Sequence, residues 1–255
     1  MNVESDFIMG KLPEVSALMQ KEVLTIMTGD DITDVATSDP TIIALGEEVL
    51  RRNIDNEIKR KYYSSQRMRD AARLKLKIQE KLDKEIEMND ALRPSMFDTC
   101  AEAALEHSML RMDDSEDLAH PSYAIKMKYS LRKMAHYKKM NAMKKLDEDR
   151  TDKKSEEEKQ QAEEFLFFLA EEWSIRVNRI ARKVLKERQE FITKHLPKPG
   201  DMKKLSEYIV SGLKAADYKD GRWNNYHDIE NLAQARLTQY NKRRAGEIDG
   251  LKYVF

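Results

Sequence analysis

The chain has 255 residues, of which 40% are hydrophobic and 36% are charged, and its formal net charge is zero. That length and apolar content can bury the core of one or two domains. Cys100 is the single cysteine, which excludes an internal disulfide framework and a cysteine-based zinc site. No stretch approaches the roughly 18 consecutive apolar residues of a membrane span. With 7% aromatic residues, 8 Gly and 6 Pro, the composition favours long amphipathic helices, so we expect an all-α protein.

The charges are unevenly distributed along the chain. Residues 1–50 are rich in Asp and Glu and contain only Lys11 and Lys21 as cations, whereas residues 126–145 contain many cations and no acid. A basic segment of this kind is a candidate phosphate-contacting surface. Glu4 and Asp6 stand where a signal peptide carries positive charge, so secretion is not expected. The expected location is nuclear or otherwise intracellular.

The first part of the chain predicts an acidic arm followed by helices. Residues 1–40 have short apolar patches separated by polar residues, and we expect one short helix and partial disorder there. From Thr41, expected to cap a helix after Pro40, apolar residues recur at helical spacing as far as Ile78. One long helix or two helices joined end to end would fit this pattern.

Later segments predict further helices and a domain boundary. Amphipathic stretches cover 97–112, 122–140 and 165–185, and the acidic stretch 147–161 is expected to be a loop. Two prolines and a glycine within 196–200 interrupt the pattern, and helices over 202–218 and 228–240 follow. We therefore expect an arm at 1–40, a helical domain at 41–195 and a second domain at 196–255.

Three groups of cations on separate predicted helices are the candidate DNA-binding residues, because Lys and Arg neutralise phosphates. The first group also carries Tyr129 and Tyr137 among its cations. The groups are Lys126, Lys128, Arg132, Lys133, Lys138 and Lys139; Arg67, Arg69 and Arg73; and Arg179, Arg182 and Lys183. The alternative for each group is a solvated helix face without a ligand.

Motifs for other chemistry do not occur in the sequence. The five histidines never form a His-Glu-x-x-His pattern, and neither a Gly-rich phosphate loop nor a serine nucleophile elbow is present. We expect no metal, no cofactor and no small-molecule substrate. Trp173 and Trp223 are interpreted as core anchors, with base stacking as the alternative.

The segment at 241–251 carries a resemblance to a known family. Asn241-Lys242-Arg243-Arg244-Ala245-Gly246-Glu247, with Leu251 four places later, resembles the first catalytic box of the tyrosine recombinase (phage integrase) family. The residues of this box are similar to those of the eukaryotic Crypton-type branch of the family, and so are the upstream segments 122–127 and 171–174. The similarity extends over about 41–251.

This resemblance implies a SAM-like multi-helix core-binding bundle, followed by the truncated helical start of a catalytic domain. Arg244 would hold the scissile phosphate through its planar fork of donors, Glu247 would orient that fork, and Arg243 would contact DNA. The family's Lys, His-x-x-Arg and Tyr nucleophile come after this box. Only residues 252–255 follow Leu251 here, so we expect no DNA cleavage by this polypeptide alone.

The leading hypothesis is therefore double-stranded DNA binding by a Crypton-like, recombinase-derived protein that is catalytically inactive alone and can form a homo-oligomer on DNA. One alternative is the N-terminal part of an active or split recombinase that integrates DNA. Another is a helical protein-interaction scaffold, whose sign would be basic residues buried in ion pairs.

Overall fold

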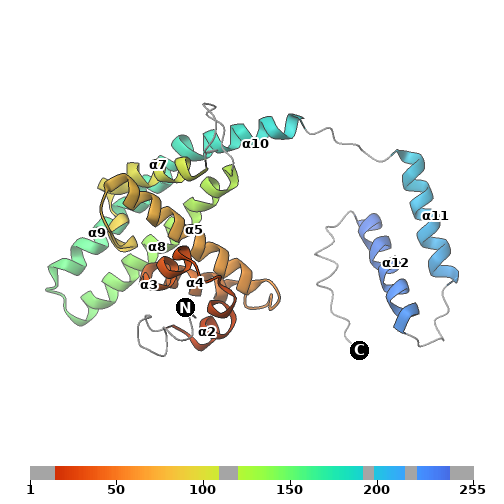
Figure 1. The fold of residues 1–255 in the computed structure, drawn as a ribbon, viewed down its shortest axis with the longest axis horizontal. Helices are drawn as coiled ribbons and strands as arrows, with labels where there is room; N and C mark the ends of the chain where they lie inside the picture. Colours follow the sequence, from red (N-terminus) through yellow and green to blue (C-terminus); the bar gives the residue numbers. More distant parts are fainter. Residues whose placement is uncertain (1–14, 109–119, 192–197, 216–222, 242–255) are drawn as a thin grey trace. The chain divides into compact units, whose positions relative to one another are not determined.

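The structure is a computed structural model that describes residues 15–108, 120–191, 198–215 and 223–241. These residues form helices, and no strand occurs among them, which confirms the expected all-α class (Figure 1). The chain divides into two compact units, Met1–Phe191 and Ile192–Phe255. Within the described parts, no helix combines the length and the apolar character that crossing a bilayer requires.

From residue 15 onward, the first unit has four short elements in succession: α2 (Ala17–Glu22), the 3-10 turn η1 (Leu24–Ile26), α3 (Asp31–Ser38) and α4 (Pro40–Arg52). Met19, Val23 and Leu24 are buried in the core. From residue 15 onward, the expected acidic arm is thus an integral part of the bundle. The helix after Pro40 is capped by Asp39 and not by Thr41, because Pro40 occupies the first helical turn and Asp39 accepts from the Thr41 and Ile42 amides.

The apolar run that follows is divided between two helices. α5 (Arg60–Leu82) packs across α4, and it ends at Asp83, whose φ of 49° lies in the left-handed region. The chain then passes through α6 (Met88–Ala91) and the 3-10 turn η2 (Pro94–Met96) into α7 (Phe97–Ser108). Buried alanines on α5 and α7 allow the two helix backbones to approach closely.

The longest helices of the unit form a hairpin. α8 (Pro121–Glu148) packs along α9 (Lys153–Glu171), which continues through the π-helical turn η3 (Ser174–Asn178) into α10 (Arg179–Phe191) (Figure 1). The loop expected at 147–161 is wrong for most of that range. Asp152 accepts from the Lys154 amide and starts α9 there, so the glutamates at 156–158 lie on a helix.

The core of the first unit is aromatic where α7, α9 and η3 meet. Phe97, Phe165 and Trp173 are fully buried or nearly so, and the Phe97 ring centroid lies 6.1 Å from that of Phe165 and 6.3 Å from that of Trp173. Both pairs have edge-to-face geometry, the arrangement that aromatic quadrupoles favour. Trp173 is therefore a core anchor, whereas the Trp223 side chain lies outside the described ones.

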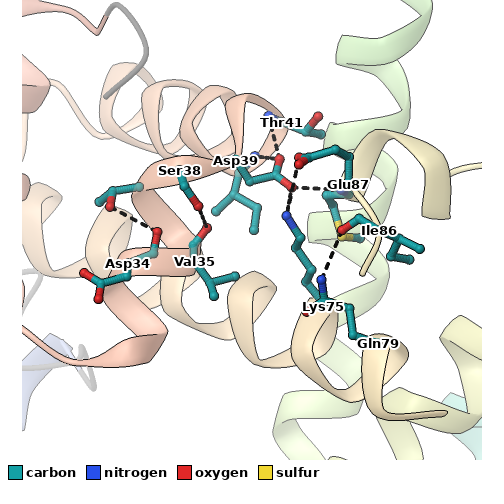
Figure 2. A network of polar contacts seen from close by, with 12 residues as sticks. Asp34, Val35, Ser38, Asp39, Thr41, Lys75, Gln79, Ile86 and Glu87 are labelled. Carbon is teal, nitrogen blue, oxygen red and sulfur yellow. Dashed lines mark hydrogen bonds and ion pairs between the residues drawn. The ribbon is translucent and has the colours of Figure 1, made fainter. Parts of the chain in front are cut away.

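A buried polar network links the elements around α5 (Figure 2). The Asp39 carboxylate is 1% exposed and accepts from Lys75 Nζ at 2.8 Å and from the Met88 amide at 2.8 Å. Asp39 also caps α4, so one side chain joins the starts of α4 and α6 to the middle of α5. Lys75 Nζ makes a longer contact of 3.4 Å with Glu87 Oε2.

The second unit contains the helices α11 (Pro199–Ala215) and α12 (Trp223–Asn241), which pack against each other. Gly212 lies at their crossing, where an added Cβ would stand 2.8 Å from Leu232 Cδ1, so only glycine fits without movement. Arg236 Nη1 donates to Ser206 Oγ at 3.0 Å across the pair. Proline at residue 199 opens α11, in keeping with its preference for the first helical turn.

Candidate nucleic-acid interface

A groove of about 810 Å³ lies on the first unit among α4, α5 and α8. Its cationic walls come from three helices: Arg52 ends α4, Arg67 lies in the first half of α5, and Lys126 lies near the start of α8. Tyr63, Tyr129, Asn53 and Gln66 also line it. The groove thus combines positive charge, aromatic rings and amides.

The three cations of the groove differ in whether an acidic side chain pairs with them. Lys126 is exposed and Arg67 is half-buried, and neither has a hydrogen bond or ion pair with another described residue. Arg52 Nε lies 3.0 Å from Glu48 Oε1, an oxygen that also accepts from Lys133 Nζ at 2.8 Å. Hydrogen bonding from Lys133 holds the pKa of Glu48 below its ordinary value. Two cations share this one carboxylate, which leaves a net positive charge beside the groove.

Tyr129 is held in a cluster of cations. The Arg52, Arg132 and Lys133 charge centres lie 5.6 Å, 5.9 Å and 5.8 Å from its ring centroid. A cation over an aromatic ring is attracted by the ring quadrupole. The Tyr129 ring therefore holds one cation from α4 and two from α8 on one side of the groove.

Asp70 is the acidic residue on the groove wall. It is nearly buried, and burial raises the pKa of its carboxyl, while the Gln66 hydrogen bond and the nearby Arg73, Arg67 and Lys126 charges oppose that shift. Gln66 Nε2 donates to Asp70 Oδ1 at 2.8 Å, and Arg73 Nη1 lies 3.1 Å from the same oxygen. Arg73 thus neutralises Asp70, which leaves the Arg67 and Lys126 charges uncompensated by a direct contact.

The positive surface continues from α8 onto α10. Lys128 Nζ donates to Ser174 Oγ at 2.9 Å, and its pKa is lowered by burial and by the positive charges of Arg132 and Arg182. Arg132, Arg179 and Arg182 are exposed and have no ion pair with a described residue. Arg179 and Arg182 are three positions apart on α10 and so lie on one face of it.

Two predicted DNA-binding residues have structural roles. Lys138 is 2% exposed, and its Nζ donates to Asn89 O, Leu92 O and Gln161 Oε1 at 2.9 to 3.0 Å, which uses all three of its protons. Arg69 donates from two nitrogens to both Asp30 oxygens, at 2.8 Å and 2.6 Å. The sequence could not distinguish these cations from their exposed neighbours, because their acceptors are 23 to 49 positions away.

Four other predicted residues are paired with acids. Lys133 and Arg73 are paired as described above, and the other two contacts are Lys139 to Glu163 at 3.0 Å and Lys183 to Glu187 at 3.8 Å. From the predicted set, Arg67 and Lys126 therefore share the groove, Lys128, Arg132 and Arg182 lie near one another on α8 and α10, and Arg179 shares a face of α10 with Arg182. Arg243, Arg244 and Glu247 lie outside the described residues.

Groove residues that the sequence analysis missed are Arg52, Asn53, Tyr63 and Gln66. A signal for two of them exists: Arg52 ends an amphipathic helix, and Tyr63 follows the basic segment 59–61. Neither signal shows that both residues face α8, because that depends on how α4 and α5 cross.

Metal and thiol chemistry have no site in the part of the chain that the structure describes. No three His, Cys, Asp or Glu side chains there lie close enough to hold a metal ion. Cys100 is fully buried, and burial raises the pKa of its thiol to about 12, so it is unreactive at neutral pH.

Comparisons with known proteins add no relative. No protein-family model matches the chain, and no curated protein or solved structure matches it either.

Proposed function

We propose that the first unit binds double-stranded DNA through the groove and the adjoining basic surface of α8 and α10. The observation that carries this proposal is the segregation of its cations. The side chains of Arg67, Lys126, Arg132, Arg179 and Arg182 make no ion pair or hydrogen bond with an acid among the described residues, whereas most other candidate cations are paired with an acid or a backbone carbonyl. A chain of zero net charge thus presents a locally positive surface.

Phosphate neutralisation by these cations would supply most of the affinity. Each contact with B-form DNA contributes about −0.9 to the slope of log K against log salt concentration. Five contacts would give a slope of about −4.5. Binding of this kind is tolerant of sequence, because phosphate contacts position a protein on DNA without reading bases.

The test is a titration of a labelled duplex with the full chain, in which fluorescence anisotropy measures binding at several salt concentrations. The variant Lys126→Ala/Arg132→Ala removes two unpaired cations, and it should lower the salt slope by about 2. Lys139→Ala/Lys159→Ala removes the same charge from ion pairs with Glu163 and Glu156, and it should leave the slope nearly unchanged. Absence of duplex binding at low salt, or equal effects of both variants, would refute the proposal.

The recombinase resemblance extends this proposal to the C-terminal segment. Arg244 would add a phosphate contact of the family's first box, with Glu247 orienting its guanidinium. The alternative, in which the chain is the front part of an active or split recombinase, predicts strand cleavage once a polypeptide with His-x-x-Arg and Tyr is added. Incubating the mixture with nicked and intact duplexes tests for that cleavage.

A helical scaffold is the competing function, and some ion pairs bear on it. Lys75 is buried against Asp39, and Arg69 is partly buried against Asp30, which is the kind of pairing expected of a scaffold. Both pairs lie within one chain and join elements of the same unit, so they stabilise the bundle and need no oligomer. The unpaired cations around the groove favour the DNA-binding function.

A further inference from the structure

The groove among α4, α5 and α8 has features that a flat phosphate-binding surface does not require. It is hollow, with a volume of about 810 Å³, and it is lined by Tyr63, Asn53 and Gln66 as well as by cations. We infer that this groove takes one unstacked nucleotide of the bound nucleic acid, with the base on Tyr63 and the phosphate on Arg67 and Lys126. The inference rests on the proposed function, because it names what the DNA places in the groove.

Size is the first argument. Sites for compact organic ligands occupy about 300 to 1,000 Å³, and the groove lies within that range. An intact duplex keeps its bases stacked inside and offers only backbone to a protein surface. A nucleotide that has left the stack, at a strand end or in a single-stranded stretch, presents a base that can enter a hollow of this size.

Tyr63 supplies the aromatic surface. It is 46% exposed, and among the described residues no cation or ring packs on it, in contrast to Tyr129 with its three cations. An exposed tyrosine in a basic groove is a platform on which any base can stack. The loss of such a platform weakens binding by about 5-fold to 150-fold per base.

The amides give the groove a preference among bases. Gln66 Nε2 donates to Asp70 Oδ1, and Asn53 Nδ2 donates to Val49 O, both at 2.8 Å. One of the two protons on each amide nitrogen is thus engaged, and the second proton and the amide oxygen have no partner among the described residues. Each amide can therefore donate and accept at once, which matches adenine, because adenine presents an exocyclic amino group beside a ring-nitrogen acceptor and thymine has no amino group.

The phosphate position follows from the unpaired cations. Arg67 and Lys126 come from different helices, line the same groove and both act on the Asp70 carboxyl. A half-buried guanidinium that makes no ion pair is partly desolvated, so an anion that reaches it is bound more strongly than in water. Phosphate fits that position, because the guanidinium fork matches two of its oxygens.

The experiment uses the full chain with labelled single-stranded oligo(dA) and oligo(dT) of equal length, and with a blunt duplex. Tyr63→Leu should weaken oligo(dA) binding by about 5-fold to 150-fold and duplex binding by a smaller factor, because an intact duplex offers no unstacked base to Tyr63. Tyr62→Leu is the matched control, because Tyr62 is an exposed neighbour with Lys61 over its ring and does not line the groove. It should leave all three affinities within about twofold. Thermal melting confirms that both variants fold.

Three outcomes overturn the inference. Equal effects of the two tyrosine variants would remove Tyr63 as a platform, and equal affinity for oligo(dA) and oligo(dT) would remove the amide preference. Full competition by free deoxyadenosine monophosphate at matched nucleotide concentration would assign the groove to a free nucleotide instead of a strand. In each case salt-dependent duplex binding can persist, so failure of the inference is distinguishable from failure of the proposed function, in which neither nucleic acid binds.

Discussion

The buried contact between Lys75 and Asp39 makes a strong prediction about stability. The Lys75→Met substitution keeps most of the aliphatic volume and removes the charge that lies 2.8 Å from Asp39 Oδ2. The Asp39 side chain is fully buried, so the substitution would leave it as a buried carboxylate without the Lys75 charge beside it. Breaking one side of a buried ion pair costs about 3–5 kcal/mol.

The structure places the expected loss at the lower end of that range. The amides of Thr41, Ile42 and Met88 would still donate to Asp39, and hydrogen bonds to the charged form stabilise it. We therefore expect Lys75→Met to lower the free energy of unfolding by about 3 kcal/mol. That loss is a large fraction of a typical domain stability of about 5–15 kcal/mol.

Urea unfolding followed by far-UV circular dichroism measures this change. Lys77→Met is the matched control, because Lys77 lies on the same helix and pairs with the more exposed Glu80 and Glu106. That variant should cost at most about 0.5 kcal/mol. Adding Asp39→Asn to Lys75→Met removes the isolated charge while keeping an acceptor oxygen, so the double variant should lose less than the sum of the single ones. A cost for Lys75→Met no larger than that for Lys77→Met would refute the reasoning.

Two further predictions concern acid stability and helix packing. Hydrogen bonding from Arg69 holds the pKa of Asp30 below its ordinary value of 3.8, so its contribution is complete above about pH 4 and is lost as the pH falls through the lower folded value. In urea titrations from pH 6 to pH 2, Asp30→Asn should therefore show a shallower acid decline than the unsubstituted chain, and an unchanged slope would contradict the role of this pair. Gly46→Ala would place a Cβ against Met68 and 2.8 Å from Met19 Cε, so we expect a loss of about 1–3 kcal/mol, and an unchanged urea midpoint would show that the methionines move aside freely.

The sequence by itself determined the helical class and most helix positions. Apolar residues at helical spacing placed helices over most of the stretches where the structure has them, because that periodicity is a local property of the chain. Prolines at positions 94, 121 and 199 stand in the first turn of η2, α8 and α11. The loop expected around Asp152 was a local error, because Asp152 caps α9. The packing of residues 15–40 is a tertiary feature, because their helices contact α4 and α5, and acidic composition does not reveal those contacts.

Only the tertiary structure decided which cations are available to a ligand. Lys133 and Arg132 are adjacent in the basic segment, but Lys133 pairs with Glu48, 85 positions away, while Arg132 is exposed. The sequence alone gives Lys138 the appearance of one more surface lysine, and folding buries it among three acceptors from two separate segments, the end of α6 and the middle of α9. The groove also exists only where α4, α5 and α8 meet. Helical periodicity depends on neighbours within a few residues, whereas the neutralisation of a charge depends on whichever acid the fold brings within about 4 Å of it.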